Sequence, residues 1–143
     1  MTLDSLLDDA GVREVDVVKT DVDGLDGKVL LGAKKMLQRH RPAVIFEWHP
    51  LMCRATSSNW TDHFDVLGQC GYEQFVWYTK YGEFSHYSGR GESAGMEMLA
   101  ELCLRSTFHD DWHYDVIALP PGYESRQLPL AEMAYARSRV SGH

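Results

Sequence analysis

The chain has 143 residues, of which 44% are hydrophobic and 24% charged, a composition typical of one globular domain with a hydrophobic core. Its formal net charge of -7 argues against a nucleic acid or an anionic membrane as a partner, because both bind basic surfaces. No apolar run approaches the roughly 20 residues that a membrane-spanning helix needs. The 3 cysteines are widely spaced and form no CxxC motif, which favours a reducing, cytoplasmic environment over a disulfide framework.

The first half of the chain has the pattern of a βαβ unit. A short helix is expected after Thr2, whose hydroxyl can cap it. The valines in 15–20 predict a strand, and apolar residues then recur at helical spacing over 25–37 until Pro42 ends the helix. The apolar run at the start of 43–48 predicts a second strand, covered on both faces, parallel to the first and joined to it by a right-handed crossover.

Two local details are expected around these strands. Asp23 stands where the N-cap of the long helix should lie, and Asp26 follows three residues later as a weak form of the capping box. Residues 51–59 are expected to form a loop after the second strand, because polar and small residues interrupt the periodic pattern there.

The second half of the chain continues with alternating elements. In chain order it predicts a helix near 60–70, an aromatic hairpin over 72–88, a loop over 88–95, a helix over 96–106, a strand over 114–122 and a tail over 123–143 with a frayed helix at 129–139. The hairpin is expected to turn near Tyr81 and Gly82. Together the elements predict an α/β fold that forms one domain over 1–143.

Acidic side chains lie at the carboxyl ends of both predicted parallel strands. Parallel sheets bind ligands beyond the carboxyl ends of their strands, so Asp21, Glu47 and His49 are expected to face one crevice. Such a group could orient a hydroxyl, accept a proton or hold a cation. The structural alternatives are that Asp23 only caps a helix, that Asp21 only binds loop amides, and that Glu47 is only a polar exit from its strand.

Two further groups have weaker functional patterns. His109 and His113 are four residues apart, a spacing that chelates a metal on a helix, but here they lead into a strand, which favours a solvated loop. The aromatic residues of 72–88 could line an acceptor pocket, although packing inside the hairpin core is the simpler expectation.

Four short motifs within residues 2–50 occur together in one known family. They are Thr2-Leu3-Asp4, Lys19-Thr20-Asp21-Val22-Asp23-Gly24, Leu31-Gly32-Ala33 and Glu47-Trp48-His49-Pro50. This run resembles the later half of an FkbM-type methyltransferase domain, and a looser similarity continues over 51–122. The linked run is more specific than any one motif.

The resemblance implies a class I, Rossmann-like fold and S-adenosylmethionine-dependent methyl transfer, usually to the hydroxyl oxygen of a small molecule. It implies that Asp21 lies at the cleft for cofactor and acceptor, with Asp23 and Gly24 as neighbouring cofactor-binding residues. From their positions at strand ends we expect Asp21, Glu47 and His49 to be the catalytic residues. The family usually has Glu where this chain has Asp23, so the charge is kept and the reach is shorter.

The glycine-rich turn that binds the cofactor in this family has no counterpart here, because the glycines of 89–95 do not follow an apolar strand. We therefore expect a partial Rossmann-like sheet, a βαβ unit plus a C-terminal hairpin and strand, that lacks the N-terminal cofactor-binding half. Strand 15–20 would then be an open edge, where a second copy in a homodimer or the missing half would pair.

Two other functions stay open at this point. A degenerate half domain could act without catalysis, as a homodimeric or partner-docking module that uses the open edge. Asp21, Asp23 and Glu47 could instead hold a divalent cation. Binding of S-adenosylmethionine would separate the enzyme from the module, and a metal-dependent rise in melting temperature would support the cation site.

Overall fold

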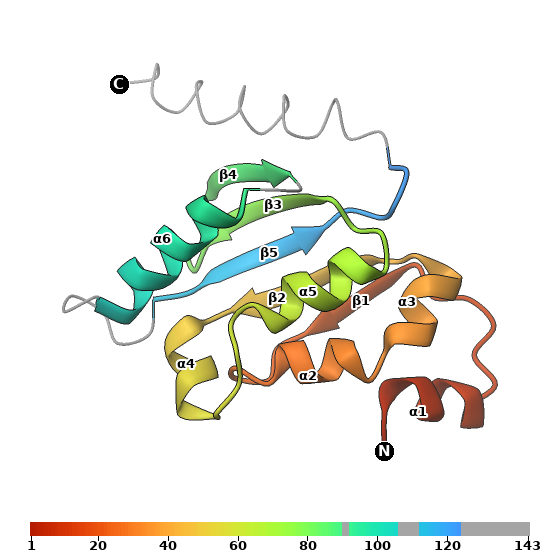
Figure 1. Ribbon diagram of the computed structural model, residues 1–143. Helices are drawn as coiled ribbons and strands as arrows, with labels where there is room; N and C mark the ends of the chain where they lie inside the picture. The colour runs from red at the N-terminus through yellow and green to blue at the C-terminus, as the bar shows by residue number, and fades with distance from the viewer. Residues whose placement is uncertain (90–91, 106–111, 124–143) are drawn as a thin grey trace.

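The computed structural model describes residues 1–89, 92–105 and 112–123, which form a five-stranded sheet with helices (Figure 1). The elements are α1 (Leu3–Asp9), β1 (Val17–Thr20), α2 (Asp26–Leu31), α3 (Lys34–His40), β2 (Ala43–Trp48), α4 (Pro50–Ala55), α5 (Asp62–Gln69), β3 (Gln74–Thr79), β4 (Phe84–Gly89), α6 (Ser93–Arg105) and β5 (Tyr114–Ala118). The expected helix at 129–139 lies outside the described residues.

The strand order in the sheet is β1-β2-β5-β3-β4. β1 and β2 are parallel, which confirms the predicted βαβ unit. β5 lies between β2 and β3 and is antiparallel to both, while β3 and β4 form the predicted hairpin. The hairpin turns where expected: the Thr79 amide donates to the Glu83 carbonyl at 2.8 Å, and Gly82 has a φ of 77°. β1 is an edge strand, as predicted.

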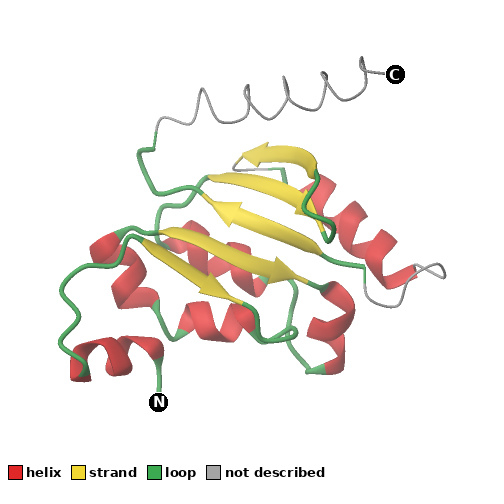
Figure 2. Cartoon of the chain, turned by 180° about the vertical axis from the view of Figure 1, so that it is seen from behind, coloured by secondary structure: helices red, strands yellow, loops and turns green. Residues whose placement is uncertain are grey.

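The two faces of the sheet are buried unequally. In β2, Val44, Phe46 and Trp48 are fully buried, whereas Ile45 and Glu47 on the other face are only partly buried. Figure 2 shows why: the strands lie in front of the helices, and no helix of the described residues covers the face toward the viewer. The expectation of cover on both faces is therefore wrong for this part of the chain.

Aromatic rings fill the core between the sheet and its helices. The indole of Trp48 has edge contacts with Trp60, Phe64 and Trp77, with ring centroids 5.6, 6.0 and 5.1 Å away. Both central indoles also satisfy their N–H groups: Trp48 donates to the Trp60 carbonyl at 3.0 Å, and Trp77 donates to Ser88 Oγ at 2.8 Å. Trp77 of the hairpin is thus core packing rather than the wall of a pocket.

The single long helix predicted after β1 is two helices, α2 and α3, which meet at Gly32 and Ala33. The break follows from Asp4 of α1. Its carboxylate accepts hydrogen bonds from the amides of Lys35 and Met36 at 2.9 and 2.8 Å, and its own amide donates to the Gly32 carbonyl at 3.0 Å. A new helix N-terminus therefore begins where α1 supplies the cap.

Part of the loop predicted over 51–59 is the short helix α4. Pro50 stands at its first turn, where a missing backbone donor does no harm, and the Met52 amide donates to His49 Nδ1 at 3.4 Å. Pro50 could therefore have predicted this helix from the sequence, because proline favours the first helical position. α6 likewise begins inside the loop predicted over 88–95.

The remaining boundaries differ for simple reasons. The strand predicted over 114–122 ends at Ala118, before the two prolines that cannot donate to a sheet. Cys53, Cys70 and Cys103 are buried thiols, which confirms the absence of a disulfide framework. No helix in the described ranges is long and apolar enough to cross a membrane.

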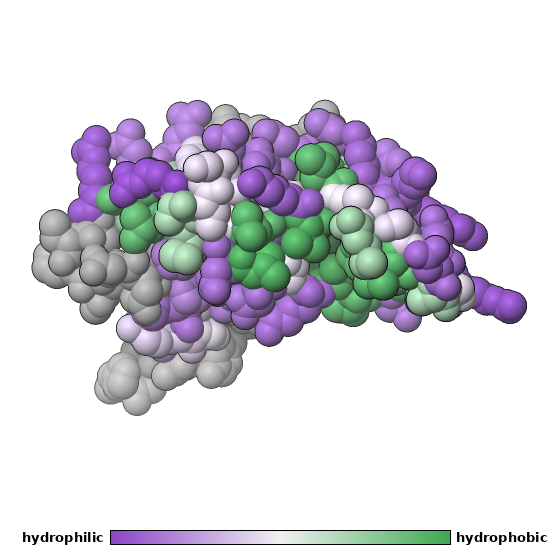
Figure 3. Space-filling model, turned by 90° about the horizontal axis from the view of Figure 1, so that it is seen from below, coloured by the Kyte–Doolittle hydropathy of each residue, from purple (hydrophilic) through white to green (hydrophobic). Residues whose placement is uncertain are grey.

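Hydrophobic side chains are also exposed outside the core. Figure 3 shows hydrophobic areas among hydrophilic ones on the face seen from below. Leu31 of α2 is 61% exposed, but single exposed apolar residues are common on soluble proteins and define no binding surface. Val17 differs because it is 58% exposed on the edge strand β1, where backbone groups can also pair with another strand.

The first prediction concerns the cap that α1 provides for α3. Asp4→Ala should lower the free energy of unfolding by about 1–2 kcal/mol, because two backbone amides lose their acceptor. Urea denaturation followed by circular dichroism measures this loss. Asp8→Ala is the matched control, since it removes an exposed carboxylate from the same helix. Equal losses in the two variants would contradict the capping role.

The second prediction concerns His63, which is 1% exposed and stacks on Phe46 with ring centroids 5.0 Å apart. Burial lowers its pKa below the ordinary value of 6.5, although the nearby Asp26 opposes this shift. The unfolded chain therefore takes up a proton on acidification that the folded chain resists. The free energy of unfolding is therefore not reduced by His63 above the unfolded-state pKa, and it falls as the pH drops below that pKa.

Comparison with His63→Phe isolates this effect, since the variant keeps an aromatic ring but cannot titrate. Between about pH 8 and pH 5.5, the wild type should lose about 1 kcal/mol of unfolding free energy relative to the variant. Urea denaturation at both pH values provides the measurement. If the difference in unfolding free energy between the two proteins is the same at both pH values, His63 titrates alike in the folded and unfolded chains.

Candidate functional site

A tight acidic turn, residues 21–24, follows β1. Asp21 and Asp23 are exposed, and Asp23 has a left-handed backbone with a φ of 50°. Asp23 is therefore not the N-cap of the next helix, because α2 begins after Leu25. Asp26 is not part of a capping box either: its side chain is fully buried, and Oδ2 accepts a 3.4 Å hydrogen bond from the Val22 amide. The turn is thus held from behind by a buried carboxylate.

Gly24 brings the acidic turn into backbone contact with α4. Its φ is 89°, and a Cβ at this position would lie 2.5 Å from the carbonyl carbon of Met52. The Thr56 hydroxyl, at the end of α4, also donates to the Gly24 carbonyl at 3.5 Å. Only glycine fits both the conformation and the space. Gly24 therefore has a structural function here, and the role expected for it in cofactor binding stays a prediction.

The parallel pairing of β1 and β2 brings Glu47 to the same edge of the sheet as this turn. One carboxylate oxygen from each of Asp21, Asp23 and Glu47 lies within 4.8 Å of the others. The predicted convergence of Asp21 and Glu47 at the carboxyl ends of the two strands is confirmed. Their functional roles stay predictions, because proximity alone does not assign them.

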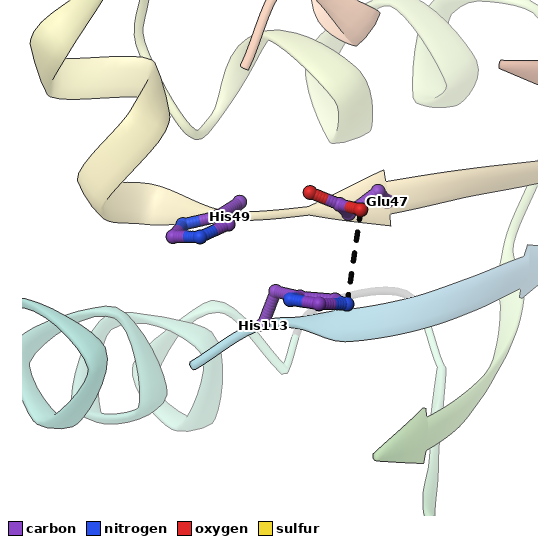
Figure 4. A group of neighbouring side chains, drawn as sticks. All are labelled: Glu47, His49 and His113. Atoms are coloured by element: carbon purple, nitrogen blue, oxygen red, sulfur yellow. Dashed lines mark ion pairs between the residues drawn. The ribbon is translucent and has the colours of Figure 1, made fainter. Parts of the chain in front are cut away.

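His113, the residue before β5, also lies beside Glu47, and the sequence did not predict this position. The register pairs Trp48 with Tyr114, so the next residue of β2's chain, His49, lies opposite the residue before β5 (Figure 4). His113 Nε2 lies 3.7 Å from Glu47 Oε2, and its ring stacks on that of His49 with centroids 5.4 Å apart. The sequence suggested a pair with His109 instead, which is outside the described residues.

The electrostatic environment of Glu47 is unusual for a carboxylate. Its pKa is raised from 4.5 to about 7, mainly by burial; His113 opposes this shift, and the negative charges of Asp21, Asp26 and Asp115 add to it. A carboxyl group with a pKa near neutral pH exists in both protonation states under physiological conditions. Glu47 is thus suited to accept a proton and to release it again.

The group of side chains around Glu47 offers several functions. Glu47 can act as a base, and the carboxylates of Asp21 and Asp23 can accept hydrogen bonds from hydroxyl or amine groups of a ligand. The imidazoles of His49 and His113, together with Glu47, present donor atoms within 4.8 Å of one another and could hold a metal ion. The site therefore combines acid–base groups with possible ligands for a cation.

Parallel strands whose carboxyl ends carry converging polar side chains are typical of α/β domains that bind ligands at this edge. The family model of the methyltransferase FkbM domain matches residues 1–73, and the chain belongs to this family. The resemblance expected from the motifs in residues 2–50 is confirmed. The match includes Asp21, Glu47 and His49, whereas His113 lies beyond it. Neither a search of curated proteins nor a search of solved structures finds a match.

The third prediction concerns the contact between the acidic turn and α4. Gly24→Ala should lower the free energy of unfolding by roughly 3 kcal/mol or more, because the new methyl group meets the backbone of Met52. Gly82→Ala is a matched control, since Gly82 also has a positive φ of 77° but no heavy atom within 4 Å of a Cβ. It should lose only about 1 kcal/mol.

Urea denaturation of both variants provides the measurement. If the two substitutions destabilise the protein equally, only the left-handed backbone matters at Gly24, and the turn does not pack closely on α4.

Proposed function

We propose that this chain contributes the later strands of a Rossmann-like, S-adenosylmethionine-dependent methyltransferase that methylates the hydroxyl oxygen of a small molecule. Membership of the FkbM methyltransferase family supports the reaction class. The observation that carries the proposal is the convergence of Asp21, Asp23 and Glu47 at the carboxyl ends of two parallel strands. In open α/β sheets that edge is where ligands bind.

The chemistry we propose is direct displacement of the methyl group from the sulfonium by the acceptor oxygen. Such a reaction depends on alignment of the two reacting atoms and on removal of the acceptor proton. In this proposal Asp21 contacts the cofactor and the acceptor at the cleft, and Asp23 and Gly24 form the cofactor-binding turn beside it. Glu47 accepts the proton, and His49 helps to orient the acceptor.

The pKa of Glu47 supports its assignment as the base. A base with a pKa of about 7 is half ionised near neutral pH, so it combines an available lone pair with useful proton affinity. Glu47 is also only partly buried, so that an acceptor can reach it from the face of the sheet that no described helix covers.

We further propose that the glycine-rich cofactor-binding turn comes from another segment. Strand β1 lies at the edge of the described sheet and exposes Val17, and an edge strand favours pairing with a further strand. That strand would belong to a cofactor-binding half or to a second copy of this chain. The same edge supports the alternative function, a non-catalytic docking module, if no cofactor binds.

The fourth prediction tests the cofactor site by calorimetric titration with S-adenosylmethionine. The chain is titrated alone and after mixing with the glycine-rich N-terminal half of a complete family member. We expect binding of one cofactor per reconstituted domain. Asp21→Asn should weaken this binding about 10- to 100-fold, because a charge-assisted hydrogen bond is lost.

Asp16→Asn is the matched control, since it makes the same substitution at the exposed opposite end of β1, and it should bind as the wild type does. Unchanged binding in Asp21→Asn would remove Asp21 from the cofactor site. No binding in either titration, together with a stable homodimer by light scattering, would favour the docking module.

A further inference from the structure

Two histidines and one glutamate face one another across the β2–β5 pair, as Figure 4 shows. Glu47 and His49 are two residues apart on the chain of β2, and His113 precedes β5. One ligand atom from each of the three side chains lies within 4.8 Å of the other two. This group shares Glu47 with the group of carboxylates Asp21, Asp23 and Glu47, but its other two members are histidines.

We propose that Glu47, His49 and His113 form a binding site for a divalent first-row transition-metal ion such as Zn²⁺. Two imidazoles and one carboxylate are a donor set that Zn²⁺ and Fe²⁺ use in proteins. Ligands about 2.1 Å from a tetrahedral ion lie about 3.4 Å apart. The observed separations of up to 4.8 Å therefore need side-chain rotations to close around an ion.

The backbone holds these donors in place before any ion arrives. The β2–β5 register places the backbones of His49 and His113 opposite each other. Their rings are stacked, with an angle of 22° between the planes, so the ring of the more exposed His113 must turn before both planes point at one ion. His49 is only 5% exposed, so its ring has little freedom to turn away. Such pre-organisation reduces the entropy lost on binding.

The charges around the site favour a cation, and the donor types favour a transition metal. Asp21 and Asp23 lie beside Glu47, and Asp115 is its partner in the β2–β5 register. A bound cation would reduce the repulsion among these carboxylates. Asp21 and Asp23 are exposed, whereas the imidazole of His49 is buried beside Glu47. Mg²⁺ prefers oxygen ligands and Zn²⁺ accepts imidazole nitrogen, so the histidines favour Zn²⁺.

The hydrogen bond between His49 and the Met52 amide would change on metal binding. His49 Nδ1 accepts a hydrogen bond from the Met52 amide, which places the ring proton of the neutral form on Nε2. Coordination through Nε2 moves that proton to Nδ1 and ends the bond to Met52. The loss of this bond, which is 3.4 Å long, opposes coordination.

Three protein ligands leave at least one coordination position for water or another oxygen. If the proposed methyl transfer is correct, the acceptor hydroxyl would occupy that position, the ion would lower its pKa, and the carboxylate oxygen of Glu47 that does not bind the ion would accept its proton. This last step rests on the proposed function, whereas the metal site itself does not. Metal binding is therefore tested without S-adenosylmethionine or an acceptor.

The fifth prediction is that the full chain binds one Zn²⁺ ion at this site, measured by calorimetry at neutral pH. Co²⁺ absorption spectra report the ligand geometry independently. His113→Gln and His49→Asn should each weaken Zn²⁺ binding by about 100-fold or more, because each removes an imidazole ligand. Asparagine is a good N-cap, so His49→Asn preserves the start of α4 and should remain folded.

His40→Gln is the matched control, because it removes a histidine of α3 outside the site, and it should bind Zn²⁺ as the wild type does. Circular dichroism confirms that each variant is folded. Absence of Zn²⁺ binding would overturn the proposal, as would equal affinity in the wild type, His49→Asn and His113→Gln. Mg²⁺ binding as tight as Zn²⁺ binding, lost in Asp21→Asn but kept in the histidine variants, would overturn it in favour of the carboxylates.

Discussion

The pairing of β2 with β1 on one side and β5 on the other is the interaction on which the site depends. The inner face of β2 buries Val44, Phe46 and Trp48, which ties the strand to the core. A shift of one residue in register would turn these side chains outward and is therefore strongly disfavoured. The same register fixes where Glu47 stands, between the acidic turn after β1 and His113 before β5.

Several residues of the family motifs stabilise the fold and lie outside the candidate site. Thr2 caps α1 through the Ser5 amide at 3.1 Å, and Asp4 caps α3 from the same short segment. Gly32 provides the carbonyl that binds Asp4. The Thr-Leu-Asp and Leu-Gly-Ala motifs thus meet in space and form one junction between helices.

Much of the fold could be predicted because its signals are local. The valines of β1, the helical period that follows and the turn of the hairpin each depend on neighbouring residues, and the parallel pairing follows from the βαβ connection. The break between α2 and α3 could not be predicted, because its cause is a cap from Asp4 in a different helix.

The part of the site that follows from the βαβ topology could be predicted, and the part that depends on β5 could not. Asp21 and Glu47 end strands that are joined by a short crossover, so their convergence follows from topology. His113 could not be included, since its position depends on the register of β5 against β2, two segments that are distant in the sequence. Asp26 was assigned wrongly because helix-capping patterns do not reveal burial, and the structure places its carboxylate beneath the turn.

The close approach of Gly24 to Met52 has a consequence for how the acidic turn and the start of α4 would respond to ligands. The turn that carries Asp21 and the helix that follows His49 meet through backbone atoms, which cannot yield by a change of rotamer. A displacement of either segment is therefore transmitted to the other. Ligands of the two segments would show a coupling free energy, and linkage requires each to alter the affinity of the other by the same factor.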